Sequence, residues 1–275
     1  MSSSIGRPSA AKTDFDPRAL RRHVLRLANR GQSFHVACAF SLIEICAVLY
    51  GRFLRYDPRD PAWPGRDYLI LSKGHGVMAM YACFYEIGWL GNADFEDYFK
   101  DGTHLRGLCE ADVPGCEVTS GSLGHGLPIA CGIAFGLKRK GSDQRVYCIV
   151  GDGEMNEGTM WEALLFAAHQ KLDNLLIIVD ANQFQAMGRT EEVLGLEPLP
   201  AKFAAFGCRT LECDGHDPAS LERAIGSFST PSGKPGVLVA RTLKGHGVSF
   251  MAGDNRWHYT KVSDEIYARA LAELS

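Results

Sequence analysis

A carboxylate and an amide form the pair of residues best suited to chemistry. Asp152 lies between two glycines directly after an apolar, β-branched run, and Asn182 follows a second run of the same kind, both within the stretch 145–190. A carboxylate and an amide oxygen that converge beside glycines suit a hard cation such as Mg²⁺, which completes its shell with water and phosphate oxygens. The pair therefore predicts a cation site that holds a phosphate-bearing cofactor.

A strand–helix–strand unit would position this pair. Strands are predicted at 145–150 and 175–179, and an apolar helical pattern at 159–170 connects them. Because a right-handed crossover makes the two strands parallel, Asp152 and Asn182 leave the sheet at the same carboxyl edge, where open α/β sheets bind ligands. A structural interpretation stays open, in which Asp152 caps a helix after a tight turn and Asn182 lies in an ordinary turn.

Strands and helices alternate along the chain without a linker or a break in composition. This alternation predicts one doubly wound α/β domain over residues 15–275, with a mostly parallel sheet and helices on both faces, behind a flexible tail at 1–14. Further strands are predicted at 66–72, 209–213 and 237–241, and helices at 17–30, 41–54, 77–87, 95–100, 127–138, 199–206, 218–228 and 265–274.

The composition indicates a cytoplasmic protein. With 29 basic and 32 acidic residues, the charge does not suggest binding to nucleic acid or to an anionic membrane. The nine cysteines form no Cys-x-x-Cys pair, and several lie in apolar patterns, which is typical of reduced thiols. No run approaches membrane-spanning length, and the first residues lack an apolar signal core.

Five motifs in order resemble the amino-terminal, diphosphate-binding half of transketolases. The Gly-Asp-Gly…Asn pairing at 151–182 resembles the diphosphate-binding motif of thiamine-diphosphate enzymes. The resemblance covers residues 17–274 and implies the thiamine-diphosphate-binding fold. The other four motifs are ANRGQSFHVACAFSLIEICAVLYGRFL at 28–54, LSKGHGVMAMYACFYEIGWL at 71–90, PGCEVTSGSLGHG at 114–126 and RTLKGHGVSFMAGDNRWHYT at 241–260.

The resemblance implies a role for each site residue. Mg²⁺, or Ca²⁺ or Mn²⁺ in its place, would be bound by Asp152, Asn182 and the backbone carbonyl of Phe184. In the family, the position of Glu157 helps paired sites to communicate. The resemblance makes His35, His75 and His258 catalytic, although each could instead be a packed structural histidine. The implied contacts to thiamine diphosphate are His75, Gly121, Ser122, Leu123, Gly151, Asp152, Gly153, Glu157, Asn182 and His258.

The chain departs from the family pattern beside these residues. Leu108 stands where transketolases have a histidine that contacts hydroxyls of the donor, and a leucine can neither donate nor accept a hydrogen bond. We therefore expect altered recognition of the sugar. The other departures are Phe34 and Ala37 at glycine positions around His35, His125 in place of glutamine, and Tyr259 in place of the glycine after Trp257-His258.

The resemblance also implies a partner chain. In the family, the glutamate that activates the cofactor belongs to a pyrimidine-binding domain, which would follow this domain in a full-length enzyme. The sequence ends at Ser275, so we expect that domain on a separate carboxy-terminal subunit. An α2β2 assembly with sites at the subunit interfaces would follow, and the chain alone would be catalytically silent.

These expectations describe the amino-terminal subunit of a two-component transketolase. It would transfer a two-carbon ketol unit from a ketose to an aldose, with sugars or sugar phosphates as substrates. Two alternatives stay open. One is another thiamine-diphosphate enzyme, such as an oxo-acid dehydrogenase first component or an enzyme that passes a ketol unit to a carrier protein or a non-standard sugar. The other is a non-catalytic binding subunit, against which the presence of Asp152, Asn182, His75 and His258 argues.

Overall fold

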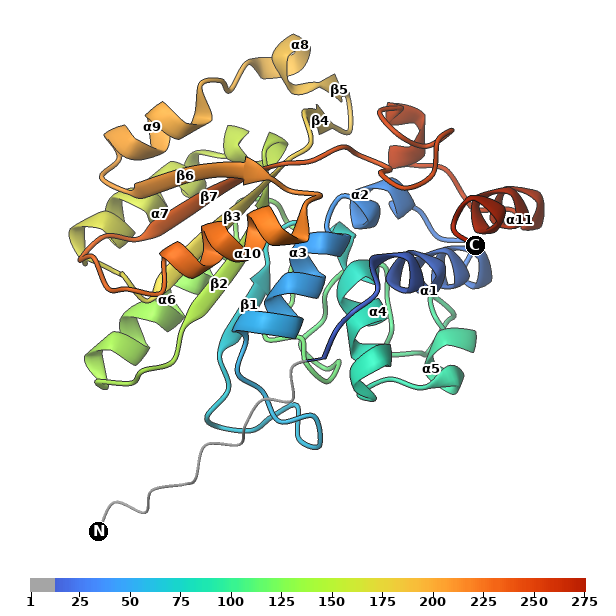
Figure 1. The fold of residues 1–275 in the computed structure, drawn as a ribbon, viewed down its shortest axis with the longest axis horizontal. Helices are drawn as coiled ribbons and strands as arrows, with labels where there is room; N and C mark the ends of the chain where they lie inside the picture. The colour runs from blue at the N-terminus through green and yellow to red at the C-terminus, as the bar shows by residue number, and fades with distance from the viewer. Residues whose placement is uncertain (1–12) are drawn as a thin grey trace.

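A parallel sheet of five strands forms the centre of the computed structural model, which describes residues 13–275. The strand order is β1-β2-β3-β7-β6, and every neighbouring pair is parallel (Figure 1). This confirms the predicted doubly wound α/β sheet. The strands are β1 (Tyr68–Leu71), β2 (Val146–Gly151), β3 (Leu175–Ala181), β6 (Arg209–Asp214) and β7 (Gly236–Arg241).

Both faces of the sheet are covered by helices, which explains why its central strands read as continuous apolar runs. Every residue of β2 and β3 is buried. Along β2, Tyr147 and Ile149 belong to one hydrophobic core, and Val146, Cys148 and Val150 belong to the other. This alternation follows from the twofold period of a strand.

The helices divide between these two cores (Figure 1). The first core includes residues of α1 (Pro17–Arg30), α2 (Val36–Phe40), α3 (Ile43–Val48), η1 (Leu49–Phe53), α4 (Met78–Ile87), α5 (Asn92–Glu96), α10 (Pro218–Ser227) and α11 (Asp264–Glu273). The second includes residues of α6 (Gly126–Arg139), α7 (Gly158–His169) and α9 (Leu199–Ala205).

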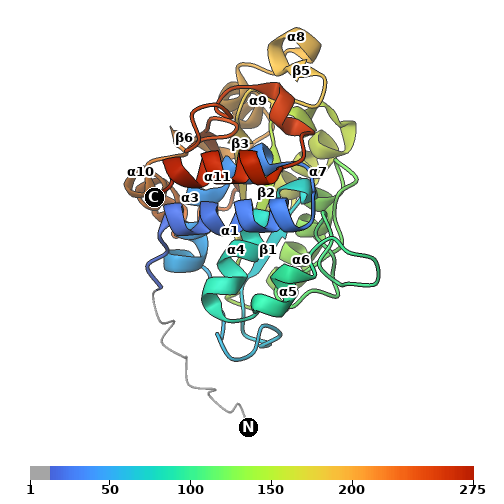
Figure 2. The ribbon, with the colours of Figure 1, turned by 90° about the vertical axis from the view of Figure 1, so that its right-hand side faces the viewer.

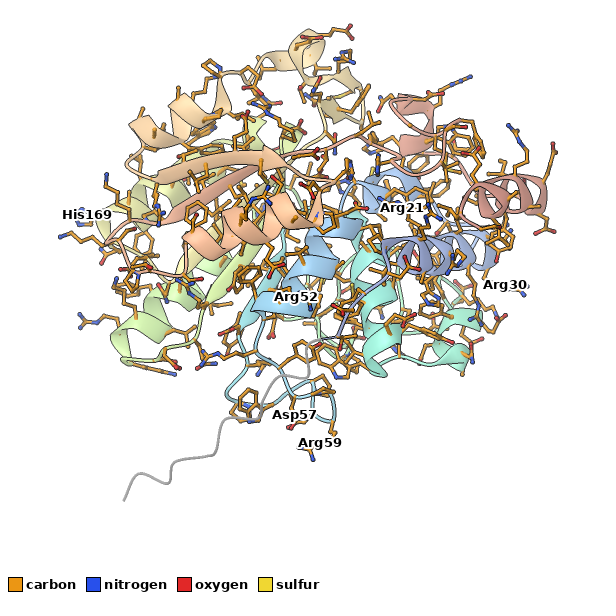
Figure 3. The ribbon with its side chains drawn as sticks, in the orientation of Figure 1. Arg21, Arg30, Arg52, Asp57, Arg59 and His169 are labelled. Atoms are coloured by element: carbon orange, nitrogen blue, oxygen red, sulfur yellow. The ribbon has the colours of Figure 1, made fainter. Side chains whose placement is uncertain are left out.

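The first and last helices, α1 and α11, lie side by side. Helix α11 runs along α1 (Figure 2), and Arg22 of α1 donates to the carbonyl oxygen of Leu274 at 2.8 Å. Arg21 of α1 points the other way, into the protein (Figure 3), and forms a bidentate ion pair with Glu44 of α3 at 2.7 and 2.9 Å. His216 binds the same carboxylate at 2.9 Å.

Two predicted helices differ from the structure. The helix predicted at 41–54 is two segments, α3 and the π-helical turn η1, and a separate short helix, α2, precedes them. The break falls at Ser41, whose hydroxyl donates to the Cys38 carbonyl at 3.1 Å and to Asp180 at 2.7 Å. The helix predicted at 95–100 is α5, at Asn92–Glu96. Its N-terminus is closed by Asp94, which accepts from the Gly91 N–H at 2.7 Å.

Three further predictions concern the N-terminal tail, the cysteines and membrane-spanning segments. Of the predicted tail at 1–14, residues 1–12 lie outside the described residues. All nine cysteines fall within the described range and are free thiols, of which only Cys213 is partly exposed. No helix in the described part of the chain has the length and apolar character needed to span a bilayer.

Candidate active site

The carboxyl edge of the sheet brings Asp152 and Asn182 together, because they follow the neighbouring strands β2 and β3. In the strand register, Gly151 pairs with Asp180. Asp152 accepts hydrogen bonds from the backbone N–H groups of Gln183 at 2.6 Å and Gly153 at 2.8 Å. The first of these bonds ties the turn after β2 directly to the turn after β3.

The carboxylate of Asp152 is buried with a residue exposure of 4%. Burial raises its pKa to about 7, the nearby charge of Asp180 adds to the rise, and the two backbone N–H donors oppose it. A carboxylate held away from water by neutral donors alone gains strongly from a bound cation. The environment of Asp152 therefore fits a metal ligand.

Asn182 and Phe184 follow in the same turn. The Asn182 Oδ1 atom accepts from the Phe184 N–H at 3.0 Å, and its Nδ2 donates to Asp180 at 3.0 Å. Phe184 begins a two-stranded antiparallel ribbon of β4 (Phe184–Gln185) and β5 (Gly188–Arg189). This ribbon leads into α8 (Thr190–Leu194), which has no buried residue.

A buried ion pair lies beneath the site. Asp180 is fully buried and pairs with Lys73, which follows β1. The same carboxylate accepts from the hydroxyls of Ser41 and Thr242. Although burial opposes ionisation of both partners, the ammonium lowers the pKa of Asp180 and the carboxylate raises that of Lys73. The pair therefore stays ionised.

Three histidines from distant parts of the chain form one cluster. The ring centroids of His35 and His75 are 5.2 Å apart, those of His35 and His258 are 5.3 Å apart, and those of His75 and His258 are 5.6 Å apart. His35 has a left-handed backbone with φ of 69° and precedes α2. His75 lies in the 3₁₀ turn η2 (Gly74–Gly76), and His258 ends the turn η4 (Asn255–His258).

The cluster is electrically neutral at pH 7. Burial and then the charges of Lys244 and Lys73 lower the pKa of His35 to about 4. Burial and the nearby charges, Lys244 first, lower the pKa of His258 to about 3. The pKa of His75 falls well below its usual range, mainly through burial. The imidazoles can therefore donate or accept hydrogen bonds but carry no charge of their own.

Lys244 determines which nitrogen of His258 carries the proton. The Lys244 ammonium lies 2.6 Å from His258 Nδ1 and 2.7 Å from Asn255 Oδ1. Because an ammonium can only donate, Nδ1 must accept and Nε2 must carry the hydrogen. His258 is thus held in the tautomer that presents an N–H donor from Nε2.

A glycine turn borders the cluster. Gly121 has φ of 149°, and a Cβ there would lie 2.7 Å from Leu108. Gly124 has φ of 85°, and a Cβ there would lie 2.6 Å from the hydroxyl of Thr159. Both positions therefore require glycine. Between them, Ser122 and Leu123 are exposed, so their backbone is open to a ligand.

Glu154 joins the separate motifs, although the sequence patterns did not single it out. Its carboxylate accepts from the Ser72 hydroxyl at 2.5 Å and from the N–H groups of Gly124 at 2.9 Å and Gly151 at 3.2 Å. Burial raises its pKa. Glu154 thus ties the end of β1, the glycine turn and the end of β2 to one another.

Two other candidate residues lie outside the histidine cluster. Glu157 is exposed at the N-terminus of α7, with its side-chain stem beside Gly124. His125 is exposed at the N-terminus of α6, and its Nδ1 lies 3.1 Å from the Leu123 carbonyl. Asp217 caps α10 by accepting from the Ala219 N–H at 3.0 Å.

A family model and relatives with curated names all point to one family. The family model described as "Transketolase, thiamine diphosphate binding domain" matches residues 17–271. The chain is 41% identical over 259 residues to an apulose-4-phosphate transketolase subunit of Actinobacillus succinogenes, covering 94% of each chain. It is 38% identical over 241 residues to a 6-deoxy-6-sulfo-D-fructose transketolase subunit of a Clostridium species, covering 87% of this chain and 88% of that one.

Solved structures agree with this family. Transketolase from Leishmania mexicana superposes with a TM-score of 0.86 at 29% identity over 94% of this chain. Transketolase from Campylobacter jejuni does so with a TM-score of 0.84 at 27% identity, also over 94% of this chain. The chain spans 40% and 41% of the length of these two proteins.

Proposed function

The chain belongs to the transketolase family, and from this premise we propose that it is the amino-terminal subunit of a two-component transketolase. The proposed reaction moves a two-carbon ketol unit from a ketose donor to an aldose acceptor, with sugars or sugar phosphates as substrates. The observation that carries the proposal is the meeting of Asp152 and Asn182 beside three neutral histidines at one edge of the sheet.

Thiamine diphosphate is the proposed cofactor, in keeping with the description of the matching family model. We assign its diphosphate to His75, His258 and the backbone around Gly121, Ser122 and Leu123, with Gly151 and Gly153 in the neighbouring turn. The cofactor supplies the carbanion and the electron sink for cleaving a carbon–carbon bond. The open glycine turn supports this assignment because its N–H groups can approach phosphate oxygens without side chains in the way.

Mg²⁺, or Ca²⁺ or Mn²⁺, is the proposed bridge to the diphosphate. Asp152, Asn182 and the backbone carbonyl of Phe184 would hold it. Asp152 is buried and forms no ion pair with any residue from 13 to 275, which supports this assignment because a divalent ion would neutralise that carboxylate. The Lys73–Asp180 pair beneath keeps Asn182 in place, since Asp180 accepts from Asn182 Nδ2.

The histidines have the proposed task of handling protons and oxygens. His258 presents an N–H from Nε2 because Lys244 occupies Nδ1, so it can donate to a phosphate or substrate oxygen. His35 and His75 are neutral and lie next to His258. Each can therefore accept a proton from a substrate hydroxyl or return it. A neutral imidazole can accept a hydrogen bond at one nitrogen and donate one at the other, so it can orient and polarise a substrate hydroxyl. Glu157, outside the cluster, is proposed to serve communication between paired sites.

A partner subunit is part of the proposal. Three relatives of similar length, matched over most of their chains, are named as subunits. We propose a carboxy-terminal subunit that carries the pyrimidine-binding domain and the activating glutamate, in an α2β2 assembly within the cytoplasm. Residues 15–275 would act as one diphosphate-binding domain of that assembly.

Reconstitution tests this function. The chain is mixed with its candidate partner, thiamine diphosphate, Mg²⁺ and a panel of ketoses, aldoses and oxo acids, and two-carbon transfer is scored by product mass. We expect transfer only when both subunits are present. Release of carbon dioxide from an oxo acid without any ketose product would instead favour a different thiamine-diphosphate enzyme, and no product in any combination would contradict the proposal.

A further inference from the structure

Two aromatic residues at the histidine cluster have no part in the proposed cofactor site. Phe34 precedes His35, and Tyr259 follows His258. Their rings stack with centroids 3.9 Å apart and an interplanar angle of 6°. Two side chains from opposite ends of the chain thus form one unit, which we call the aromatic wall.

The aromatic wall lies directly against His35. The centroid of Tyr259 is 5.6 Å from that of His35, with the rings nearly perpendicular, and the centroid of Phe34 is 6.5 Å away in a similar arrangement. Because His35 is also in contact distance of His75 and His258, the wall borders the cluster at which a substrate would react.

The stability of the fold gives little reason for this arrangement. Tyr259 is 66% exposed, so its ring contributes only a small part of the stabilisation that full burial would give. Lys261 Nζ lies 5.6 Å from the centroid of Phe34 and adds one weak cation–π contact at an exposed position. Tyr259 is exposed and Phe34 is partly buried, and such a stacked pair suits a binding surface because rigid rings lose little entropy when a ligand is bound.

The two rings of the aromatic wall are also larger than the residues that the resembled family pattern has at these positions. In that pattern glycines stand at the positions of both Phe34 and Tyr259. In this chain the two rings that replace them stack on each other. Leu108 changes the site in the same direction, since it replaces a histidine with hydrocarbon and lies against Gly121 while 39% exposed. Three departures thus put larger or less polar side chains at positions where the resembled pattern has glycine or histidine.

We propose that Phe34 and Tyr259 determine substrate specificity by packing against a hydroxyl-poor, C–H-rich face of the substrate's carbon chain. The inference rests on the proposed ketol-transfer function. A hydroxyl pressed against the wall would lose its hydrogen bonds to water without gaining a partner. A C–H face would instead fill the same space with favourable dispersion contacts.

Two acceptor aldehydes of equal length test the wall. Propanal and glyceraldehyde differ only in their hydroxyls, and hydroxypyruvate serves as the ketol donor for the reconstituted complex. We expect the double replacement Phe34→Gly, Tyr259→Gly to lower the propanal-to-glyceraldehyde ratio of kcat/KM about tenfold. Each single replacement should cause most of this loss, because either one removes the stack, so the two effects do not add. Tyr259→Phe keeps the ring and should retain the ratio.

Three measurements separate the possible outcomes. Thermal unfolding and the dissociation constant of thiamine diphosphate show whether a variant is folded and binds the cofactor. If folded variants still transfer the ketol unit with an unchanged propanal-to-glyceraldehyde ratio, the aromatic wall does not determine specificity. The proposed function is unaffected by that result. If the wild-type complex transfers nothing, the proposed function fails. Saturation-transfer NMR with unreactive propanol and glycerol then decides: preferential saturation of propanol that the double replacement removes supports the wall, and equal saturation overturns it.

Discussion

At the residue scale, the site depends on charges that are paired beneath it and imidazoles that are kept neutral within it. Lys73 and Asp180 neutralise each other below the turn after β3, whereas Lys244 points its charge at His258. The same ammonium therefore lowers the proton affinity of the cluster and orients one of its rings. Asp152 is the one acidic group among these whose pKa is raised, to about 7.

The neutral histidines give a prediction for pH titration. In ¹H–¹⁵N spectra of the chain without cofactor, His35 and His258 should stay neutral down to about pH 5, since their pKa values are about 4 and about 3. Unfolded histidines titrate near 6.5, so the unfolded state binds more protons as the pH falls below 6.5. Stability from these groups is present above pH 6.5 and is lost as the pH falls toward 4.

A midpoint near 6.5 for His35 or His258 would contradict the charge environment described above.

At the element scale, a buried ion pair connects α1 to α3. Arg21 and Glu44 have side-chain exposures of 4% and 5%, and hydrogen bonds from His216 and Arg21 outweigh burial and lower the pKa of Glu44 to about 2. Leu243 donates its N–H to the other nitrogen of His216 at 2.7 Å. The network thus links both N-terminal helices to the segment that carries Lys244.

Removing the charge of Glu44 should therefore destabilise the fold. Glu44→Gln leaves the Arg21 guanidinium buried without its partner, and we expect a loss of about 3–5 kcal/mol in the free energy of unfolding, measured by urea denaturation. The matched control is Glu86→Gln, which removes a carboxylate that is 38% exposed and lies 2.7 Å from His23, and it should cost less than about 1 kcal/mol. Equal losses in both variants would show that burial of the Arg21–Glu44 pair is unimportant.

The same elements show what could be predicted from the sequence and what could not. The buried strands and Asp217 as a helix cap were predictable because local patterns encode them. The break at Ser41 was not, because it depends on Asp180, which is distant in sequence. Lys73, Asp180, Glu154 and Lys244 were missed for the same reason: their roles arise from partners in other segments of the chain. The only local signal for the two lysines was their position before a glycine in motifs already noted for their histidines.

At the scale of the whole molecule, the parallel sheet explains why one edge carries the site. The turns after β1, β2, β3 and β7 contribute Lys73, Asp152, Asn182 and Thr242, and all four strands run in the same direction. Histidines from the N-terminal and C-terminal segments then complete the edge, because α1 and α11 pack together and hold both segments there. A diphosphate and a cation at this edge would contact nearly every motif of the chain.

The central claim is that Asp152 anchors this edge as a site for a cation and a diphosphate. The most direct test is calorimetric binding of thiamine diphosphate to the reconstituted complex with and without Mg²⁺. We expect binding that requires Mg²⁺ and that Asp152→Ala weakens by about a hundredfold or more, while Asp217→Ala, which removes only a helix cap, leaves the affinity unchanged. Equal affinity for wild type and Asp152→Ala, or binding that persists fully without a divalent ion, would contradict the claim.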